Sequence, residues 1–516
     1  MVEIREIYQG LDESLRRAAA KKLRCAEENI TGVQLLHRAV DARHKDEVHF
    51  VCTAAVSLRQ GEEKYPAYAP ETDAEPKKLT KKPKYRPVVC GAGPAGLFAA
   101  LTLARAGAEP ILLERGDAVE QRRGAVARFR LTGVLDTESN VQFGEGGAGC
   151  FSDGKLNSGT HDPRGRSVFR ELVRCGAPEE ILWQARPHIG TDRLPGAVRA
   201  LRQEIIDAGG EVRFRSRVTD IRTENGELRG VETEQEYIET DTLILAAGHS
   251  ARDLFEALYS RGVRMEAKPF SIGVRAEHPQ SVINTAQYGA FAGHPALGAA
   301  DYRLSAHLPN GRGVYTFCMC PGGTVVAAAS EEGRLVTNGM SVFARDGRNA
   351  NSAVLVSVTP ADFASDHPLA GVEFQRCWEK AAYELGGGAY RAPAQRMEDF
   401  LHGKASECGG SVKSTYPRGV RWCALDGCLP GFVSGSLREG IPMLDRRLKG
   451  FAMPDAVLTG VESRSSSPVR ILRDSRGEAN ITGLFPCGEG AGYAGGILSA
   501  AVDGIRCAEW ALEKYE

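Results

Sequence analysis

The sequence predicts an α/β fold with a parallel-sheet domain in two pieces, a β-rich domain inserted between them and a small N-terminal α+β module. Three observations carry this prediction. A buried strand, a glycine turn, a helix and a second strand follow one another over residues 87–114. A second strand–glycine–helix pattern occupies residues 483–516. Between residues 266 and 449 short alternating apolar runs dominate, which is typical of antiparallel strands.

The length of 516 residues is too great for one compact core, so we expect two or three domains. We predict an N-terminal module, a linker rich in proline and lysine, a first part of the parallel-sheet domain, the inserted domain and a C-terminal part of the parallel-sheet domain. In that order they span residues 1–64, 65–86, 87–265, 266–449 and 450–516.

Composition excludes several classes of protein. The formal net charge of -1 gives no bulk reason to bind nucleic acid or an acidic membrane. No stretch approaches the ~20 apolar residues of a membrane-spanning helix, and the N-terminus lacks the apolar core of a secretion signal. The thirteen cysteines are scattered and form no paired CxxC clusters. We therefore expect a soluble cytoplasmic protein with reduced thiols and no metal site.

The first glycine turn has the spacing of a dinucleotide-binding fingerprint, Gly91-Ala92-Gly93-Pro94-Ala95-Gly96. Gly91 permits a tight turn, Gly93 lets the backbone approach a pyrophosphate, and Gly96 lets the helix pack close to the strand. The helix that begins here directs its free N–H groups at the phosphates. Glu114 follows the second strand, where a carboxylate can accept both ribose hydroxyls and would repel a 2′-phosphate. FAD or NAD therefore fits better than NADP.

Three further stretches are rich in backbone and small residues, which suits close approach by a flat ring or a phosphate. They are the loop 141–158 with Gly146 and Gly147, the strand end with Ala247 and Gly248, and the terminal loop with Gly488, Gly495 and Gly496. The alternative for the first of these is a flexible surface loop. The helix that begins near Ile497 would direct its N-terminus at an electron-rich ring. Arg115 either meets adenosine or phosphate groups or is an ordinary exposed arginine.

Taken together, these blocks resemble the FAD-binding pattern of the glutathione-reductase-like oxidoreductase superfamily. A closer resemblance is to the group called FAD-dependent dehydrogenases, which covers nearly the whole chain. The segments that carry it are FGEGGAGCFSDGKLNSGT, PHIGTDRL, FSIGVRAEHPQ, FCMCPGG, VTNGMSVFARDGRNANSA and SSPVRILRD. The resemblance implies a Rossmann-like FAD-binding domain with an inserted β-rich substrate domain.

The resemblance also implies roles for individual residues. Gly91, Gly93 and Gly96 would hold the pyrophosphate of FAD, and Glu114 the adenine ribose. Val218 stands where such enzymes pass backbone groups to adenine, and Gly495, Gly496 and Ile497 would lie beside the pyrimidine edge of the flavin. Gly488 and Glu489 occupy the place of a Gly-Asp pair that contacts the ribityl and pyrophosphate region. Glutamate is one methylene longer than the aspartate of the family.

Two residues are candidates for a catalytic role. Lys155, in a glycine-rich turn, would either stabilise reduced flavin or bind an anionic substrate, or it is an exposed turn lysine. Cys318 and Cys320 form a CxC pair whose side chains would point the same way on a strand, so the alternatives are a redox dithiol and two buried core thiols.

The sequence as a whole predicts an FAD-dependent oxidoreductase that transfers hydride between flavin N5 and an organic substrate. Only residues 87–114 combine a GxGxxG turn with a second strand and an acid after it, so the sequence holds one full Rossmann fingerprint. NAD(P)H would therefore act only as a transient electron donor, and a protein electron donor or acceptor is an alternative. The competing hypothesis is an FAD-containing RNA-associated or macromolecule-modifying protein that uses the N-terminal module for recognition.

Overall fold

The computed structural model describes residues 1–70, 78–157 and 159–515. Residues 71–77 of the predicted linker, Ser158 at the end of the predicted glycine-rich loop, and Glu516 lie outside the described residues. Within the described ranges, no helix combines the length and the apolar character needed to cross a membrane.

The predicted parallel sheet is present and has five strands in the order β22-β10-β4-β5-β6. Every neighbouring pair is parallel, and all but the edge strand β6 are fully buried. The strands are β4 (Val88–Cys90), β5 (Ile111–Leu113), β6 (Glu211–Arg213), β10 (Leu243–Leu245) and β22 (Leu484–Pro486). The sheet thus joins strands from the two ends of the chain, as the α/β prediction requires.

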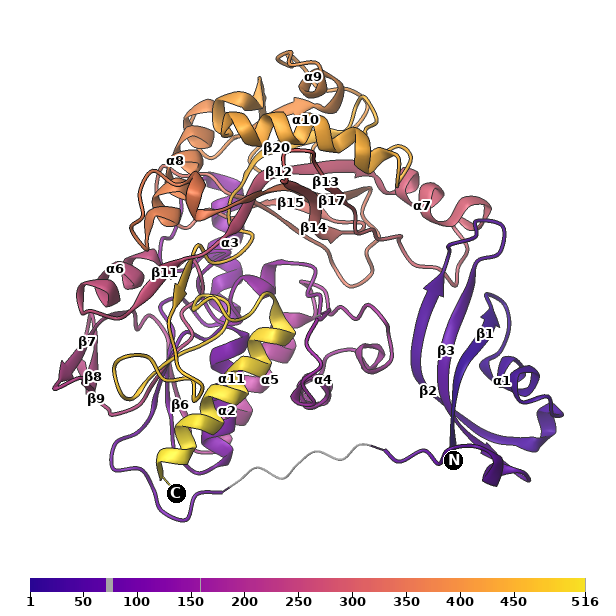
Figure 1. Cartoon of the computed structure of the whole chain (residues 1–516), viewed down its shortest axis with the longest axis horizontal. Helices are drawn as coiled ribbons and strands as arrows, with labels where there is room; N and C mark the ends of the chain where they lie inside the picture. Colours follow the sequence, from indigo (N-terminus) through magenta and orange to yellow (C-terminus); the bar gives the residue numbers. More distant parts are fainter. Residues whose placement is uncertain (71–77, 158, 516) are drawn as a thin grey trace.

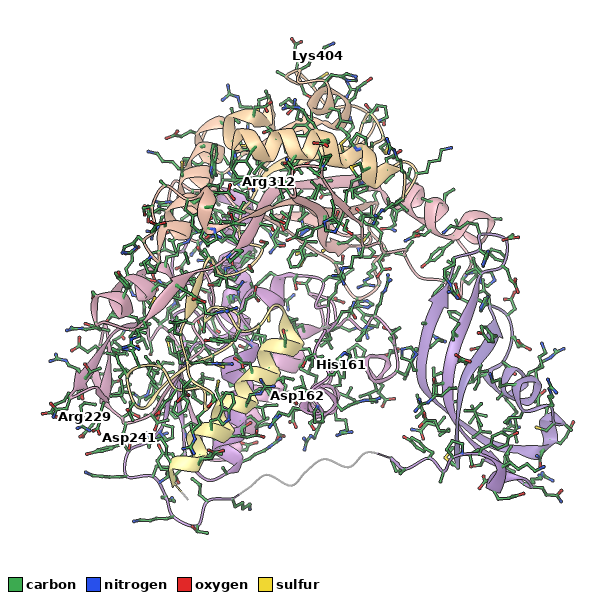
Figure 2. The ribbon with its side chains drawn as sticks, viewed as in Figure 1. His161, Asp162, Arg229, Asp241, Arg312 and Lys404 are labelled. Carbon is green, nitrogen blue, oxygen red and sulfur yellow. The ribbon has the colours of Figure 1, made fainter. Side chains whose placement is uncertain are left out.

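Two helices from opposite ends of the chain pack tightly beside this sheet, α2 (Pro94–Arg105) and α11 (Ile497–Leu512) (Figure 1). A Cβ atom on Gly504 would stand only 2.1 Å from the Ala95 carbonyl oxygen, so only glycine permits this approach. Figure 2 shows Asp162 beside α11, where its carboxylate accepts a hydrogen bond from Arg506 at 2.6 Å.

The predicted β-rich segment forms a seven-stranded mixed sheet in the order β13-β14-β17-β12-β20-β18-β19. Helix α10 (Gly431–Asp445) packs over it. The strands are β12 (Phe270–Pro279), β13 (Ser305–His307), β14 (Gly313–Cys320), β17 (Asn349–Val358), β18 (Ala392–Arg396), β19 (Val420–Trp422) and β20 (Val457–Glu462). Strand β20 lies beyond residue 449, where the sequence predicted the inserted domain to end. It pairs with β12 and β18 because it is buried along its whole length and is apolar except at Thr459 and Glu462.

The N-terminal module is an antiparallel sheet, β1-β3-β2, with helix α1 packed on it. Its elements are β1 (Val2–Gly10), α1 (Leu15–Leu23), β2 (Ile30–Asp41) and β3 (His49–Leu58). Ser14 caps α1 by accepting a hydrogen bond from the Arg17 amide. Figure 1 shows the module at one side of the molecule, next to α7.

The remaining helices and strands flank the two large sheets. They are α3 (Val119–Thr132), α4 (Arg164–Arg174), α5 (Leu194–Asp207), α6 (Arg252–Ser260), α7 (Gln280–Tyr288), α8 (Ala370–Leu385), α9 (Met397–Leu401), β7 (Val218–Glu224), β8 (Glu227–Thr233), β9 (Tyr237–Glu239), β11 (Met265–Ala267), β15 (Thr324–Ala327), β16 (Thr337–Met340) and β21 (Val469–Ile471).

A buried ionic cluster ties these parts together. The Glu379 carboxylate on α8 accepts two hydrogen bonds from Arg252 on α6, at 2.7 and 2.9 Å. It accepts two more from Arg464, at 3.0 and 2.9 Å, and one from the Ser463 hydroxyl. Burial alone would raise the pKa of Glu379, but the two guanidinium groups outweigh burial and hold the pKa well below its usual range. One ionised carboxylate thus holds both arginines, Arg252 on α6 and Arg464 after β20.

Replacing this carboxylate by an amide should strongly destabilise the protein. In Glu379→Gln the two buried arginines keep only the Glu331 carboxylate, 2.6 Å from Arg252 and 3.7 Å from Arg464, as a counter-charge among the described residues. We expect the free energy of unfolding to fall by about 3–5 kcal/mol. Denaturant unfolding of the flavin-loaded protein measures it. The control is Glu373→Gln on the same helix, whose exposed side chain pairs with Arg376 and should cost less than about 1 kcal/mol. Equal effects of the two substitutions would contradict a structural role of the cluster.

Candidate cofactor and substrate site

One cavity of about 1010 Å³ brings most of the predicted site residues together. It is bounded by the carboxyl ends of the parallel strands, by β14 of the seven-stranded sheet and by one residue of the N-terminal module. The predicted residues that line it are Gly91, Gly93, Pro94, Ala95, Glu114, Arg115, Gly147, Lys155, Val218, Ala247, Gly248, Cys318, Glu489, Gly495, Gly496 and Ile497.

Four predicted residues lie behind the cavity wall instead: Ala92, Gly96, Gly146 and Gly488. Each sits where backbones or side chains crowd together. A Cβ atom on Gly96 would meet the Gly91 carbonyl oxygen at 1.8 Å, and one on Gly146 would meet Cys150 Sγ at 2.1 Å. These residues shape the loops that line the cavity.

The Glu114 carboxylate gathers three loops around itself. One of its oxygens accepts hydrogen bonds from the Gly116 and Gly144 amides at 2.8 and 2.9 Å, and the other accepts from the Ala92 amide at 2.8 Å. A carboxylate offers about four acceptor positions, so three are occupied within the chain. The sequence predicted that Glu114 accepts both ribose hydroxyls. The structure leaves room for about one further donor and reveals a second task, which is to join the glycine loops.

The turn before α2 fits a pyrophosphate. The first intrahelical bond runs from Leu97 N to Gly93 O at 2.9 Å, so the amides at the start of α2 have no acceptor within the helix. A Cβ atom on Gly93 would meet only the Gly147 Cα, at 4.0 Å, and Cβ atoms on Gly248, Gly495 and Gly496 would meet nothing within 4 Å. The backbone is therefore open to the cavity at these four glycines, as a dinucleotide requires.

The terminal loop is held from below by Asp503 on α11. One Asp503 oxygen accepts a hydrogen bond from the Gly488 amide at 2.8 Å, and Arg473 donates to both oxygens. Glu489 accepts a hydrogen bond from the Gly496 amide at 3.3 Å. Burial raises the pKa of Glu489 to about 7, against the opposing effects of that bond and of Lys268. The Glu489 side chain thus links the start of this loop, at Gly488, to its end at Gly495 and Gly496.

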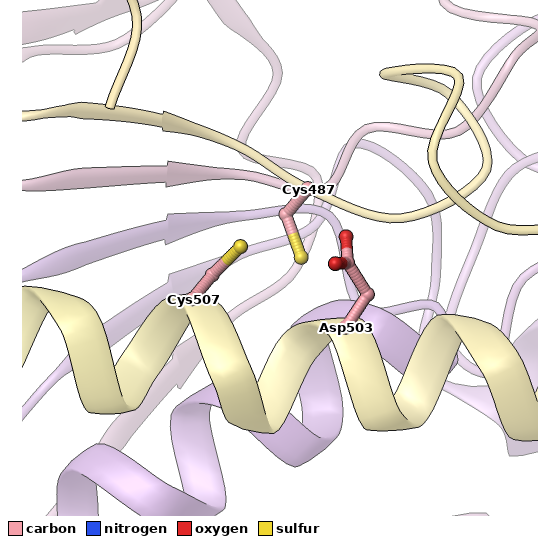
Figure 3. Close-up of side chains that lie close together, drawn as sticks. All are labelled: Cys487, Asp503 and Cys507. Carbon is pink, nitrogen blue, oxygen red and sulfur yellow. The ribbon is translucent and has the colours of Figure 1, made fainter. Parts of the chain in front are cut away.

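Cys487, Asp503 and Cys507 converge in the same place (Figure 3), with one potential ligand atom each, all within 4.8 Å of one another. Arg473 already neutralises the Asp503 carboxylate and also donates to Cys507 Sγ at 3.3 Å. A guanidinium in direct contact with two of the three groups opposes a metal cation there. The cluster is best explained as a brace between α11 and the loop.

Arg115 is not simply exposed. It donates to Glu138 and Asp253 at 3.0 Å and lies over the Phe143 ring, 3.9 Å from its centroid. Its side chain is thereby held at the cavity wall beside Glu114.

Lys155 faces the cavity from the glycine-rich turn. Its ammonium nitrogen lies 3.2 Å from an Asp153 oxygen, and Asp153 also accepts from Arg345. That nitrogen is buried and has no hydrogen-bond partner among the described residues. Lys155 is therefore placed to donate to a bound molecule.

The prediction that Cys318 and Cys320 share one face of the strand is wrong. The pairing of β14 with β17 shifts between Phe317 and Cys320, and Cys318 has φ of 41°. At this bulge Cys318 is exposed and Cys320 is buried, although both line the cavity. The Cys320 thiol donates to the Cys318 carbonyl oxygen at 3.3 Å. Although Cys318 is exposed to the cavity, the surrounding protein desolvates its thiol and raises the pKa, so the thiol is protonated at neutral pH. All thirteen cysteines, each within the described ranges, are free thiols.

Glu462 is a cavity residue that the sequence analysis missed. It is the last residue of β20, and one oxygen lies 3.2 Å from Arg275 Nε without a hydrogen bond of good geometry. Arg275 is fully buried and donates to the Cys318 carbonyl and to Asn338 at 2.9 and 3.0 Å. Burial raises the pKa of Glu462 to about 7, and Arg275 limits the rise. A lone glutamate ending an otherwise apolar strand was the available signal.

Comparisons with known proteins agree with this geometry. Residues 85–258 match the model of pyridine nucleotide-disulphide oxidoreductases, and residues 269–465 match that of the C-terminal domain of FAD-dependent proteins. Residues 4–57 match a domain of unknown function. A protein of Clostridium beijerinckii described as uncharacterized is 48% identical over 528 residues, covering 100% of this chain and 99% of its own.

Solved structures that align with the chain are much more distant. CtdE in complex with FAD is 12% identical, with 82% of each chain covered and a TM-score of 0.32. Glycine oxidase from Bacillus cereus is 12% identical, with 84% and 96% covered and a TM-score of 0.31. L-Amino acid deaminase from Proteus myxofaciens is 13% identical, with 85% and 92% covered and a TM-score of 0.36.

The assignment therefore depends on the sequence matches and on the site. The predicted Rossmann-like FAD-binding fold, the cofactor and the enzyme class are confirmed. The chain belongs to the FAD-dependent oxidoreductase family and is an oxidoreductase whose cofactor is FAD.

Proposed function

We propose that the enzyme transfers a hydride between flavin N5 and a small organic substrate, and that Glu462 exchanges the accompanying proton. The observation that carries this proposal is the continuity of the cavity. The glycine loops at the ends of the parallel strands and the Glu462 carboxyl on the seven-stranded sheet line the same space. In this proposal the parallel-sheet part binds FAD, and the seven-stranded part contacts the substrate.

The cofactor roles assigned above follow the same division. Gly91, Gly93 and the first turn of α2 would hold the pyrophosphate, and Glu114 a ribose hydroxyl. Val218 would meet adenine, while Gly495, Gly496 and Ile497 would lie beside the pyrimidine edge. Bound FAD supplies the acceptor or donor of the hydride.

The proton needs a separate partner. When a substrate C–H bond beside an O–H or N–H group is oxidised, the carbon loses a hydride and the heteroatom loses a proton. The Glu462 carboxylate takes that proton, and in the reverse direction the protonated carboxyl returns it. A pKa near 7 suits both directions at neutral pH. Arg275 holds the carboxyl in place, and Lys155 is available for an anionic group of the substrate.

The direct test of this function is the visible spectrum of the purified protein, followed by anaerobic addition of NADH and then NADPH. Bleaching of a flavin spectrum would support a transient nicotinamide donor and direct the search to an acceptor substrate. A flavin spectrum that persists would favour reduction by a substrate or a protein partner. Absence of flavin even after incubation with FAD would contradict the proposal.

Gly93→Val should remove FAD and leave the fold intact. The added side chain meets little protein but enters the space assigned to the pyrophosphate. We expect the flavin-to-protein ratio to fall close to zero with the circular dichroism spectrum unchanged. Gly124→Val on the exposed face of α3, where a Cβ atom meets nothing within 4 Å, should keep its flavin. Full FAD occupancy in Gly93→Val would refute the site assignment.

Glu462→Gln should separate the proton step from cofactor binding. We expect FAD to stay bound and substrate-driven flavin reduction to slow by about 10²–10⁴-fold. The wild-type rate should rise as the pH passes through about 7, because the carboxylate is the base, and the variant should lose this rise. An infrared pH titration should show one fewer carboxyl protonating near pH 7.

The matched control is Glu277→Gln. Glu277 is another buried carboxyl of the seven-stranded sheet, bonded to Thr415 and Asn349 and outside the cavity lining. The rate of flavin reduction in Glu277→Gln should stay near that of the wild type. A wild-type pH profile in Glu462→Gln would exclude Glu462 as the base.

Cys318→Ser and Cys320→Ser address the dithiol hypothesis. Because both cysteines are free thiols and the Cys320 thiol is bonded to the Cys318 carbonyl oxygen, we expect flavin reoxidation to be unchanged in both variants. A large loss shared by the two, measured by stopped-flow absorbance, would instead support a redox dithiol.

A further inference from the structure

We propose that the N-terminal module forms part of the wall of the substrate cavity, where His37 is a specificity-determining residue at the opening. This inference concerns access to the flavin and stands whichever reaction the enzyme performs. It gives residues 1–64 a task inside the enzyme itself.

Strand β2 extends beyond its own sheet by pairing with the segment that follows α4. The Arg38 amide donates to the Trp183 carbonyl at 2.7 Å, and the Ala185 amide donates to the Arg38 carbonyl at 3.0 Å. These bonds form a parallel bridge between Arg38 and Gln184. The module is thus joined by backbone to a segment that lines the cavity, since Gln184 and Ala185 both face it.

The Arg38 side chain secures the same junction. Its guanidinium carbon lies 4.8 Å from the centroid of the Phe50 ring within the module and 4.5 Å from that of the Trp183 ring outside it. A guanidinium over two aromatic faces links the module to the catalytic body through two cation–π contacts.

A second junction lies at the far end of the module. Lys45 donates to the Gln287 carbonyl near the end of α7. Leu297 is buried in the module's own apolar core, and Tyr288 and Phe291 pack against it. The module therefore spans from the segment after α4 to the segment after α7, as Figure 1 shows.

Between these junctions His37 is exposed and lines the cavity together with Gln184 and Arg186. Arg186 pairs with Asp301, which also lines the cavity. Among the described residues that line the cavity, His37 is the one that belongs to the N-terminal module. Arg186 and Arg303 line the same cavity and make its wall polar, so we expect the side chain at position 37 to influence which polar groups enter.

The test uses the full-length flavin-loaded protein and needs no substrate. Arg38→Ala removes both ring contacts and should raise the opening rate of the junction about tenfold. Hydrogen exchange of the residue 38 and Ala185 amides measures the opening, and iodide quenching of flavin fluorescence measures access to the cavity. Both should increase. Arg5→Ala, which removes an exposed arginine of the same module that pairs with Glu3, should change neither.

Two substitutions at His37 test the narrower part of the proposal. His37→Ala should widen the opening and raise iodide quenching, whereas His37→Trp should narrow it and lower quenching, with unchanged exchange at Ala185. Faster exchange in Arg38→Ala without increased quenching would overturn the proposal, as would equal quenching in the two His37 variants. RNA retained by the wild type and lost in Arg38→Ala, with quenching unchanged, would overturn it in favour of a recognition module.

Discussion

The proposed cofactor site depends on one buried carboxylate whose hydrogen bonds come from backbone amides. Glu114 accepts from three loops that are distant in sequence, at Ala92, Gly116 and Gly144. Hydrogen bonds from amides to a carboxylate are stronger than neutral ones, and they need no cation. Because Glu114 directly follows β5, the parallel sheet fixes the carboxylate, and the carboxylate in turn fixes the loops that open onto the cavity.

The remaining charged groups solve a different problem, which is to join parts of the chain without leaving a buried charge unpaired. Glu379 does this with Arg252 and Arg464, and Asp503 does it with Arg473 and the Gly488 amide. In both places the carboxylate meets cations and further donors, so the cost of burial is offset by several bonds. The parts of the fold that frame the cavity are therefore coupled by charge as well as by apolar packing.

Most of the parallel-sheet part could be predicted from the sequence, because fingerprint spacing and short apolar strands are local signals. The structure places most residues of the glycine loops at the cavity, and Ala92, Gly96, Gly146 and Gly488 just behind its wall, while their roles toward the cofactor stay predictions. The pairing of segments that are distant in the sequence could not be predicted in this way. The place of β20 in the second sheet, the bulge at Cys318 and the three donors to Glu114 each depend on which segments become neighbours.

The same reasoning explains why Glu462 escaped notice and why it matters. Donors within the chain occupy most acceptor positions of the Glu114 and Glu379 carboxylates. Each therefore has at most about one position left for a substrate proton. Glu462 is different, because among the described residues one of its oxygens has Arg275 at 3.2 Å and no hydrogen bond. An under-bonded carboxyl of raised pKa in a cavity wall is costly for stability. Such a group is expected where a proton has to be exchanged, and it lies on the sheet that faces the cofactor loops across the cavity.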